Sequence, residues 1–174
     1  MSKSLDYNTL ETLDELNEDL KLQNLKLSIV IIGGTLGVYH LGKQYRSTMD
    51  IDVLINNKEE EGHLKLLRKH GLDIPYVIEV PPQEEVAIQE RTDDIIHLSN
   101  LIVFLPKIEI LALYKLMTIR GKDFEDLQNY PILDKCNIEE LQHMIDDYKN
   151  YLFNDHPDYN YKRFDELLET RNLI

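Results

Sequence analysis

Two aspartates at a spacing of two residues, Asp50 and Asp52, are the side chains of this sequence best suited to hold a metal ion. They fall in residues 49–55, an apolar segment that alternates at first and ends at an asparagine pair, which predicts a β-strand. Alternate strand residues project to the same side, so both carboxylates would share one face. A hard divalent cation such as Mg²⁺ would relieve their mutual repulsion. The alternative interpretation is an exposed edge strand with two solvated polar positions.

A glycine pair before these aspartates suggests a site for phosphate. Residues 27–32 form a continuous β-branched run, typical of a buried strand, and Gly33-Gly34-Thr35 ends it. Residues 35–41 then suit a short helix that opens at this turn. Backbone N–H groups in such a turn and the N-terminus of a helix bind anions. A phosphate site and paired carboxylates in one stretch are the two parts that metal-assisted phosphoryl transfer needs.

Familiar nucleotide and metal motifs fit this stretch poorly. Residues 37–43 approach a P-loop, G-x-x-x-x-G-K-[ST], but Gln44 stands where the Mg²⁺-binding hydroxyl is required. A dinucleotide fingerprint begun at Gly33 fails because Thr35 replaces its second glycine. An EF-hand loop begun at the first aspartate lacks its glycine. The six histidines show no H-x-x-x-H or H-E-x-x-H pattern.

The surrounding elements predict an α+β fold (mixed α/β) with a helical C-terminal third. We expect helices over residues 5–25, 35–41, 58–70, 107–120, 122–128, 137–151 and 161–172, and strands over 27–32, 49–55, 76–80, 85–90 and 101–105. The first helix would bury Leu10, Leu13, Leu16 and Leu20. Pro106 is expected to begin the helix over 107–120, and Asn137 with Glu140 resembles a capping box. One domain is expected over 1–174, with its core over about 25–130 and closing helices over about 137–172.

Composition excludes several classes of protein. The 174 residues carry 19 basic and 32 acidic side chains, a formal charge of −13, so the surface as a whole should repel nucleic acid. No apolar run approaches the ~18 residues of a membrane span. The single cysteine, Cys136, cannot form an internal disulfide, which favours a cytoplasmic setting.

A second motif, in the later half of the chain, strengthens the first. It reads Lys115-Leu-Met-Thr-Ile-Arg120-Gly-Lys122-Asp123-Phe-Glu-Asp126-Leu127, and the first reads Gly33-Gly34-Thr35 followed by Arg46-Ser47-Thr48-Met49-Asp50-Ile51-Asp52. Together they resemble the signatures GGT…R-x-S/T-x-DID and K-x-x-x-x-R-x-K-D-x-x-D-L of bacterial nucleotidyltransferases of the polymerase-β-like superfamily. The nearest group comprises short members related to the toxins of abortive-infection toxin–antitoxin systems.

The resemblance implies a nucleotidyltransferase-like mixed sheet flanked by helices, and transfer of a nucleoside monophosphate (NMP) from a nucleoside triphosphate (NTP) with Mg²⁺ or Mn²⁺. By this resemblance, Gly33, Gly34 and Thr35 would bind the phosphates, and Asp50 and Asp52 would be the catalytic, metal-binding residues. Arg46 would lie near the triphosphate or support its loop. The far wall of the nucleotide cleft would be lined by Lys115, Lys122 and Asp123. A small-molecule or protein acceptor is favoured over nucleic acid. A cognate antitoxin or a second copy of the chain is the expected macromolecular partner.

Blander roles stay open for several of these residues. Arg46 could pair with one of the many acids, Lys122 and Asp123 could cap a helix junction, and Lys115 could extend outward from its apolar helix. A third carboxylate, common in the superfamily, is not evident in the sequence, and Glu79, Glu90, Asp93 and Asp94 are its candidates. The alternative function is therefore a catalytically weak or inactive binding protein on the same fold, one half of a toxin–antitoxin pair.

Overall fold

The computed structural model describes residues 3–46, 50–57, 61–75 and 81–174. The chain divides into two compact units, the first formed within residues 1–77 and 83–107 and the second within 78–82 and 108–174. The single domain expected over 1–174 stays a prediction. Within the described ranges, no helix combines the length and the apolar character needed to cross a membrane.

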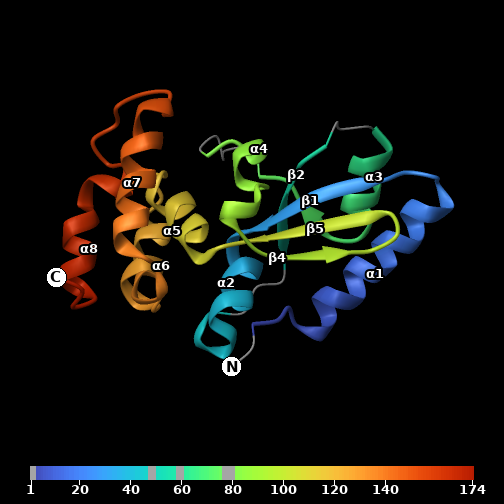
Figure 1. The fold of residues 1–174 in the computed structure, drawn as a ribbon, viewed down its shortest axis with the longest axis horizontal. Coiled ribbons are helices and arrows are strands. Elements are labelled where there is room, and N and C mark those ends of the chain that lie inside the picture. The colour runs from blue at the N-terminus through green and yellow to red at the C-terminus, as the bar shows by residue number, and fades with distance from the viewer. Residues whose placement is uncertain (1–2, 47–49, 58–60, 76–80) are drawn as a thin grey trace. The chain divides into compact units, whose positions relative to one another are not determined.

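The first unit is built on a five-stranded mixed sheet with the order β3-β2-β1-β5-β4 (Figure 1). The strands are β1 (Leu27–Ile32), β2 (Ile51–Ile55), β3 (Leu72–Asp73), β4 (Thr92–His97) and β5 (Leu101–Pro106). The central strand β1 runs antiparallel to β2 and parallel to β5, while β3 is parallel to β2 and β4 antiparallel to β5. The predicted mixed sheet is confirmed.

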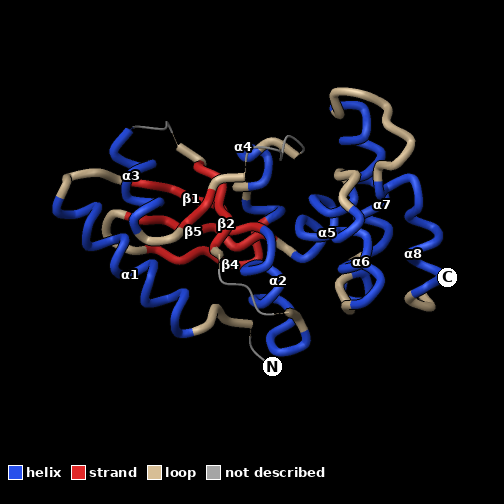
Figure 2. The backbone as a smooth tube through the Cα atoms, turned by 180° about the vertical axis from the view of Figure 1, so that it is seen from behind, coloured by secondary structure: helices blue, strands red, loops and turns tan. Residues whose placement is uncertain are grey.

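Helices surround this sheet (Figure 2). They are α1 (Tyr7–Leu22), α2 (Gly33–Leu41), α3 (Glu61–Lys69) and the short α4 (Gln83–Val86), with 3₁₀ turns at Gly42–Gln44 and Gln89–Arg91. Leu13, Leu16 and Leu20 are buried as predicted, but Leu10 is 39% exposed. The prediction for Leu10 is wrong because the buried stripe of α1 runs instead through the neighbouring Thr9.

Three sequence predictions are wrong for residues 85–106, which include the edge strand β4 and its neighbour β5. The strand expected over 85–90 is wrong, since α4 and a 3₁₀ turn occupy that region. The polar stretch after it forms the unpredicted edge strand β4, which pairs with β5 through its backbone although only its isoleucines suggest a strand. Pro106 ends β5 and does not begin a helix, because it pairs with Thr92 of β4, and α5 starts two residues later at Ile108. The Pro106 carbonyl also lies 2.7 Å from His40 Nε2. The strand expected over 76–80 lies outside the described residues.

The second unit is helical, as expected for the C-terminal third. It contains α5 (Ile108–Leu116), α6 (Gly121–Asn129), α7 (Ile138–Tyr148) and α8 (Phe164–Thr170), with 3₁₀ turns at Leu133–Lys135, Lys149–Tyr151 and Asn160–Arg163. Every residue of α5 is buried, so this helix forms the centre of the unit. Asn137 caps α7 by accepting the Glu140 N–H through its side-chain oxygen (3.0 Å), which confirms this half of the predicted capping box. The backbone N–H of Asn137 donates to Glu109 Oε1 (3.5 Å) instead of to Glu140.

A bidentate ion pair ties the C-terminal end of the chain to the rest of this unit. Arg171 donates from Nε and Nη2 to the two carboxylate oxygens of Asp134 (2.8 and 2.9 Å) and from Nη1 to the Gln128 carbonyl (3.2 Å). The hydrogen bond from Arg171 lowers the pKa of Asp134 below its ordinary value. The pair therefore links the residue after α8 to the end of α6 and the turn that follows it.

This pair predicts a pH-dependent contribution to stability. A carboxylate with a lowered folded-state pKa stabilises the protein above its unfolded pKa of about 4, and the gain is lost as the pH falls through the folded value. Arg171→Met should therefore be less stable than wild type at pH 7, and the difference should shrink below about pH 4. Urea unfolding of both proteins from pH 7 down to pH 2.5 measures it. A difference that stays constant over that range would contradict the prediction.

Candidate functional site

The glycine turn lies directly against one of the two predicted catalytic aspartates. The register of β1 and β2 pairs Ile32 with Asp52, so Gly33 follows at the same end of the sheet. Gly33 has a φ of +64°, a conformation that side chains rarely adopt, and a Cβ added there would lie 2.9 Å from Asp52 Oδ2. Glycine is required at this position both by the backbone and by the approach of the carboxylate.

The segment before β2 is tied to the same helix. Thr35 is buried in the first turn of α2, and its hydroxyl donates to the backbone carbonyl of Asp50 (3.3 Å). Asp50 itself is exposed and precedes β2, whereas Asp52 lies within the strand. The alternation of β2 therefore fixes the face from which the Asp52 side chain projects. It does not apply to Asp50, so a shared face for both carboxylates stays a prediction. The structure nevertheless brings the glycine turn, Thr35 and the aspartate segment together.

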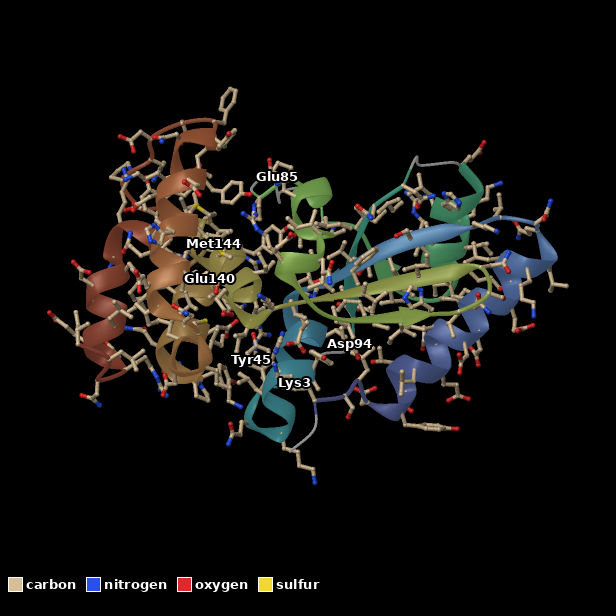
Figure 3. The ribbon with its side chains drawn as sticks, in the orientation of Figure 1. Lys3, Tyr45, Glu85, Asp94, Glu140 and Met144 are labelled. Atoms are coloured by element: carbon tan, nitrogen blue, oxygen red, sulfur yellow. The ribbon has the colours of Figure 1, made fainter. Side chains whose placement is uncertain are left out.

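Arg46 follows Tyr45, which is labelled in Figure 3 and packs against α2. A Cβ at Gly37 would lie 2.5 Å from the buried Tyr45 ring, so this glycine is what allows the ring to sit against the helix. The Arg46 guanidinium carbon lies 5.7 Å from the centre of the same ring, a cation–π arrangement. The arginine therefore follows directly on the residue that packs against the helix opened by the glycine turn.

The lysine of the second motif is buried in an ionic cluster of the second unit. Lys115 Nζ lies 2.9 Å from Asp126 Oδ2 and 3.5 Å from Asp123 Oδ1, and the three residues are 5%, 4% and 7% exposed respectively. The alternative that Lys115 extends outward is therefore wrong, because α5 is buried on every side. The lysine charge is neutralised by the two aspartates within the unit.

Asp123, another residue of the second motif, lies at the junction between α5 and α6. Asp123 lies in the first turn of α6 and accepts a hydrogen bond from the Thr118 hydroxyl (2.7 Å), and Arg120 Nε lies 3.9 Å from it. Asp123 thus holds the junction, in line with the blander role left open for it. Lys122, the adjacent residue, is exposed. The predicted site residues accordingly fall in two groups, one in each unit.

A further aspartate, Asp73, lies beside Asp52 and was missed by sequence reasoning. The parallel pairing of β2 with β3 makes the two aspartates register partners, as Ile51 and Leu72 are. Register partners project from the same face on strands about 5 Å apart. Two carboxylates in that relation repel each other unless a cation or a proton lies between them. The only signal in the sequence is an acid between Leu72 and Ile74, in a strand too short to predict.

The acids proposed from sequence as a third carboxylate have other surroundings. Asp93 accepts hydrogen bonds from Tyr39 Oη (2.7 Å) and Lys3 Nζ (3.1 Å), and burial, with this bond, raises the pKa of Tyr39, which keeps its hydroxyl a donor. Asp94, labelled with Lys3 in Figure 3, is exposed and accepts the N–H of Ile95. Glu90 is exposed in a 3₁₀ turn, and Glu79 lies outside the described residues. Within the described ranges, no three His, Cys, Asp or Glu side chains form a ready metal site.

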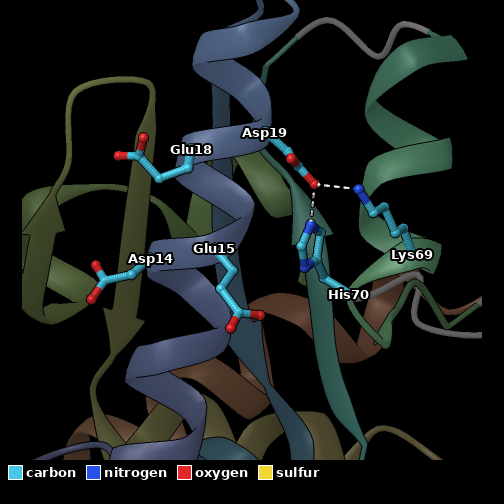
Figure 4. A pocket seen from close by; sticks show the side chains of 6 residues that line it. All are labelled: Asp14, Glu15, Glu18, Asp19, Lys69 and His70. Atoms are coloured by element: carbon cyan, nitrogen blue, oxygen red, sulfur yellow. Dashed lines mark hydrogen bonds and ion pairs between the residues drawn. The ribbon is translucent and has the colours of Figure 1, made fainter.

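A surface depression of the first unit has a lining that includes none of these residues. It has a volume of about 430 Å³, lies between α1 and the end of α3, and is lined by Asp14, Glu15, Glu18, Asp19, Lys69 and His70 (Figure 4). Asp19 Oδ2 lies 2.8 Å from Lys69 Nζ and 2.7 Å from His70 Nε2, and these hydrogen bonds lower the pKa of Asp19. The arrangement fastens the two helices together, and nothing in it resembles the predicted site.

Substitution of two glycines separates the effect of backbone strain from that of the Asp52 contact. Gly33 and Gly42 both have positive φ (+64° and +59°), but nothing lies within 4 Å of a Cβ at Gly42. Gly42→Ala should cost about 1–2 kcal/mol through strain alone. Gly33→Ala should cost more, because its methyl group also displaces the Asp52 carboxylate. Urea unfolding of both variants measures the difference, and equal losses would contradict the close approach.

A comparison with protein-family models gives one finding that spans both units. A family described as nucleotidyltransferase of unknown function (DUF6036) matches residues 8–171. No curated protein matches the sequence. The match therefore includes the glycine turn, the aspartates of β2 and β3, and the ionic cluster of α5 and α6.

Proposed function

Because the chain belongs to a family of nucleotidyltransferases of unknown function, we propose that it transfers an NMP from an NTP to a hydroxyl, phosphate or protein side chain. In this reaction the acceptor oxygen bonds to the α-phosphorus, the bond from that phosphorus to the bridging oxygen breaks, and pyrophosphate leaves. The observation that carries the proposal is the Asp52 carboxylate against the Gly33 turn at the end of β1. The proposed phosphate-binding backbone of the Gly33 turn and the acidic Asp52 side chain are thus adjacent.

The first turn of α2 is proposed to bind the phosphates. The leading N–H groups of a helix have no partner within the helix, and they attract anions. The residue that caps α2 is Ile32, whose side chain has no acceptor to offer them. Gly33 and Gly34 add no side chain that would keep a phosphate away from the backbone. Thr35 supports the turn by anchoring the Asp50 carbonyl.

The donor set around this turn fits Mg²⁺ or Mn²⁺. Asp50 and Asp52 would hold the ion with carboxylate oxygens, which these hard cations prefer, and substrate phosphate oxygens commonly complete their coordination. When bound, the ion would offset the negative charge of the triphosphate and favour attack at the α-phosphorus. Asp73, beside Asp52, is proposed as the third carboxylate, which accepts the proton of the attacking hydroxyl.

The basic residues have separate proposed tasks. Arg46 would contribute positive charge near the triphosphate. Lys122, which is exposed on the second unit, and the adjoining Asp123 remain proposed nucleotide-binding residues on the resemblance of their motif alone. Lys115 favours the alternative of a catalytically weak or inactive binding protein, because its charge is already paired with two aspartates. The chain charge of −13 favours a small-molecule or protein acceptor over nucleic acid. A cytoplasmic setting, and a cognate antitoxin or second copy as partner, belong to the same proposal.

An equilibrium titration of Mg²⁺-NTPs tests the proposed site. Wild type should bind at least one Mg²⁺-NTP, and Asp50→Asn and Asp52→Asn should weaken binding by about tenfold or more, as expected for lost charged ligands. Asp94→Asn is the matched control, because this exposed aspartate lies in β4 at the opposite edge of the sheet. Equal binding by wild type and all three variants would refute the assignment of the metal site.

A further inference from the structure

An ionic contact within the first unit joins α1 to the end of α3, directly before the strand that carries Asp73. In α1, Asp19 Oδ2 accepts a hydrogen bond from Lys69 Nζ (2.8 Å) and lies 2.7 Å from His70 Nε2 (Figure 4). The His70 side chain is 10% exposed, whereas that of Lys69 is 64% exposed. Exposed ion pairs contribute little, so we expect the shielded contact with His70 to hold the end of α3.

His70 leads directly into β3. It follows the last residue of α3, and its backbone N–H donates to the carbonyls of Leu66 (3.1 Å) and Leu67 (3.2 Å), so it still belongs to the last helical turn. Gly71 has a φ of +75°, the conformation that commonly ends a helix, and β3 begins at Leu72. Because a single residue separates His70 from the strand, a displacement of His70 is passed on to β3.

The strand β3 depends on such an anchor because it is short. It consists of two residues, so its ladder with β2 can contain only a few hydrogen bonds. Leu72 is buried and holds the strand against the core, while Asp73, the second residue, is exposed. The Asp19 contact adds a polar constraint from α1. The place of Asp73 beside Asp52 therefore depends on how firmly α1 holds the end of α3.

We infer that Asp19 is a positioning residue, which acts through the start of β3 to keep Asp73 in place beside Asp52. The inference rests on the proposed function, in which Asp73 accepts the proton of the attacking hydroxyl. A base must lie within hydrogen-bond distance of the proton it accepts, and a misplacement of about 1 Å can slow a reaction by about 10²-fold. The proposed active site thus extends to a helix that carries neither motif.

Hydrogen exchange tests the anchor. Asp19→Ala should raise the exchange rates of the amides of residues 70–73 by about tenfold, because a segment with fewer contacts opens locally more often. The amides of β1, at the centre of the same sheet, should change much less, and they report any general loss of stability. Asp14→Ala is the matched control, because Asp14 is an exposed acid of the same helix that lines the same depression. Unchanged exchange over 70–73 in Asp19→Ala would overturn the anchor.

Transfer rates in a double-mutant cycle test the positioning role. Asp19→Ala should slow transfer from Mg²⁺-NTP by about 10–100-fold and leave the Kd for Mg²⁺-NTP within about threefold, because a proton acceptor affects the rate more than the affinity. In a protein that already carries Asp73→Asn, the same change should slow transfer by less than about twofold, because the base that it positions has been removed. Equal slowing in both backgrounds would overturn the positioning role.

Two further comparisons complete the test. Asp19→Asn, which keeps an oxygen acceptor for the histidine, should give rates of exchange and transfer between those of wild type and the alanine variant, and it serves if the alanine variant does not fold. If wild type transfers no label from any NTP, the proposed function and the positioning role fail together, while hydrogen exchange still decides the anchor.

Discussion

Lys115→Met is expected to lower the free energy of unfolding by about 3–5 kcal/mol, the usual cost of leaving a buried charge without its partner. Asp126 loses its hydrogen bond from Lys115 Nζ, and Asp123 loses the nearer of its two cationic neighbours. Both carboxylates are buried, so water cannot replace the ammonium without opening the unit. Urea unfolding at pH 7 measures the loss.

Two further variants identify the cause of that loss. Lys122→Met removes an exposed lysine from the same motif and should change stability by less than about 0.5 kcal/mol. Lys115→Met combined with Asp126→Leu should recover a large part of the loss, because an apolar pair often replaces a buried ion pair at little cost. A Lys115→Met protein as stable as Lys122→Met would contradict the ionic cluster.

Asp73→Asn is expected to slow nucleotidyl transfer by about 10²–10⁴-fold, the range for loss of a general base. The same substitution should leave stability unchanged or raise it, because it removes repulsion between neighbouring carboxylates on β2 and β3. A residue kept only for the fold would show the opposite pattern. Transfer rate and melting temperature, measured on one preparation, separate the two roles.

The control for Asp73 is again Asp94→Asn, which removes an exposed carboxylate from the far edge of the sheet. It should leave both transfer and stability close to those of wild type. Asp73→Asn should also bind Mg²⁺-NTP within a few-fold of wild type, since a proton acceptor acts on the rate more than on affinity. Full transfer activity in the Asp73 variant would place the third carboxylate elsewhere.

Features set by local patterns could be predicted from the sequence. Residues 27–32 are a continuous β-branched run before two glycines, and β1 has the same bounds. The turn at Gly33 needed a residue that tolerates positive φ, and the glycine was visible as such. The helical C-terminal third follows from long apolar periodicity, and the cap at Asn137 from its side-chain chemistry.

Features set by tertiary pairing could not be predicted. The strand β3 has two residues, and only its pairing with β2 makes Asp73 a neighbour of Asp52. The polar edge strand β4 is stabilised by backbone hydrogen bonds to β5, which leave no periodic signal. Proline is a common first residue of a helix, yet Pro106 is the last residue of β5, and its carbonyl oxygen is hydrogen-bonded to the His40 ring.

Lys115 shows how burial reverses an expectation drawn from one helix. A lysine in an apolar helix is expected to extend its ammonium to water. Here all of α5 is buried, so no route to water exists along the helix and the charge needs partners. Asp123 and Asp126 supply them from α6. The Asn160 side chain donates to the Lys115 carbonyl (3.0 Å) at the end of α5. The folded position of α6, rather than the sequence around Lys115, determines the outcome.

Transfer of label from NTPs tests the central claim most directly. The protein is incubated with Mg²⁺ and cell extract, with either α-³²P- or γ-³²P-labelled NTPs, alongside Asp52→Asn. Wild type should transfer label from an α-labelled NTP to a macromolecule or small molecule, release the γ-label as pyrophosphate, and lose this transfer in the variant. Absence of transfer from every α-labelled NTP, transfer of the γ-label to the acceptor, or equal transfer by Asp52→Asn would contradict the account.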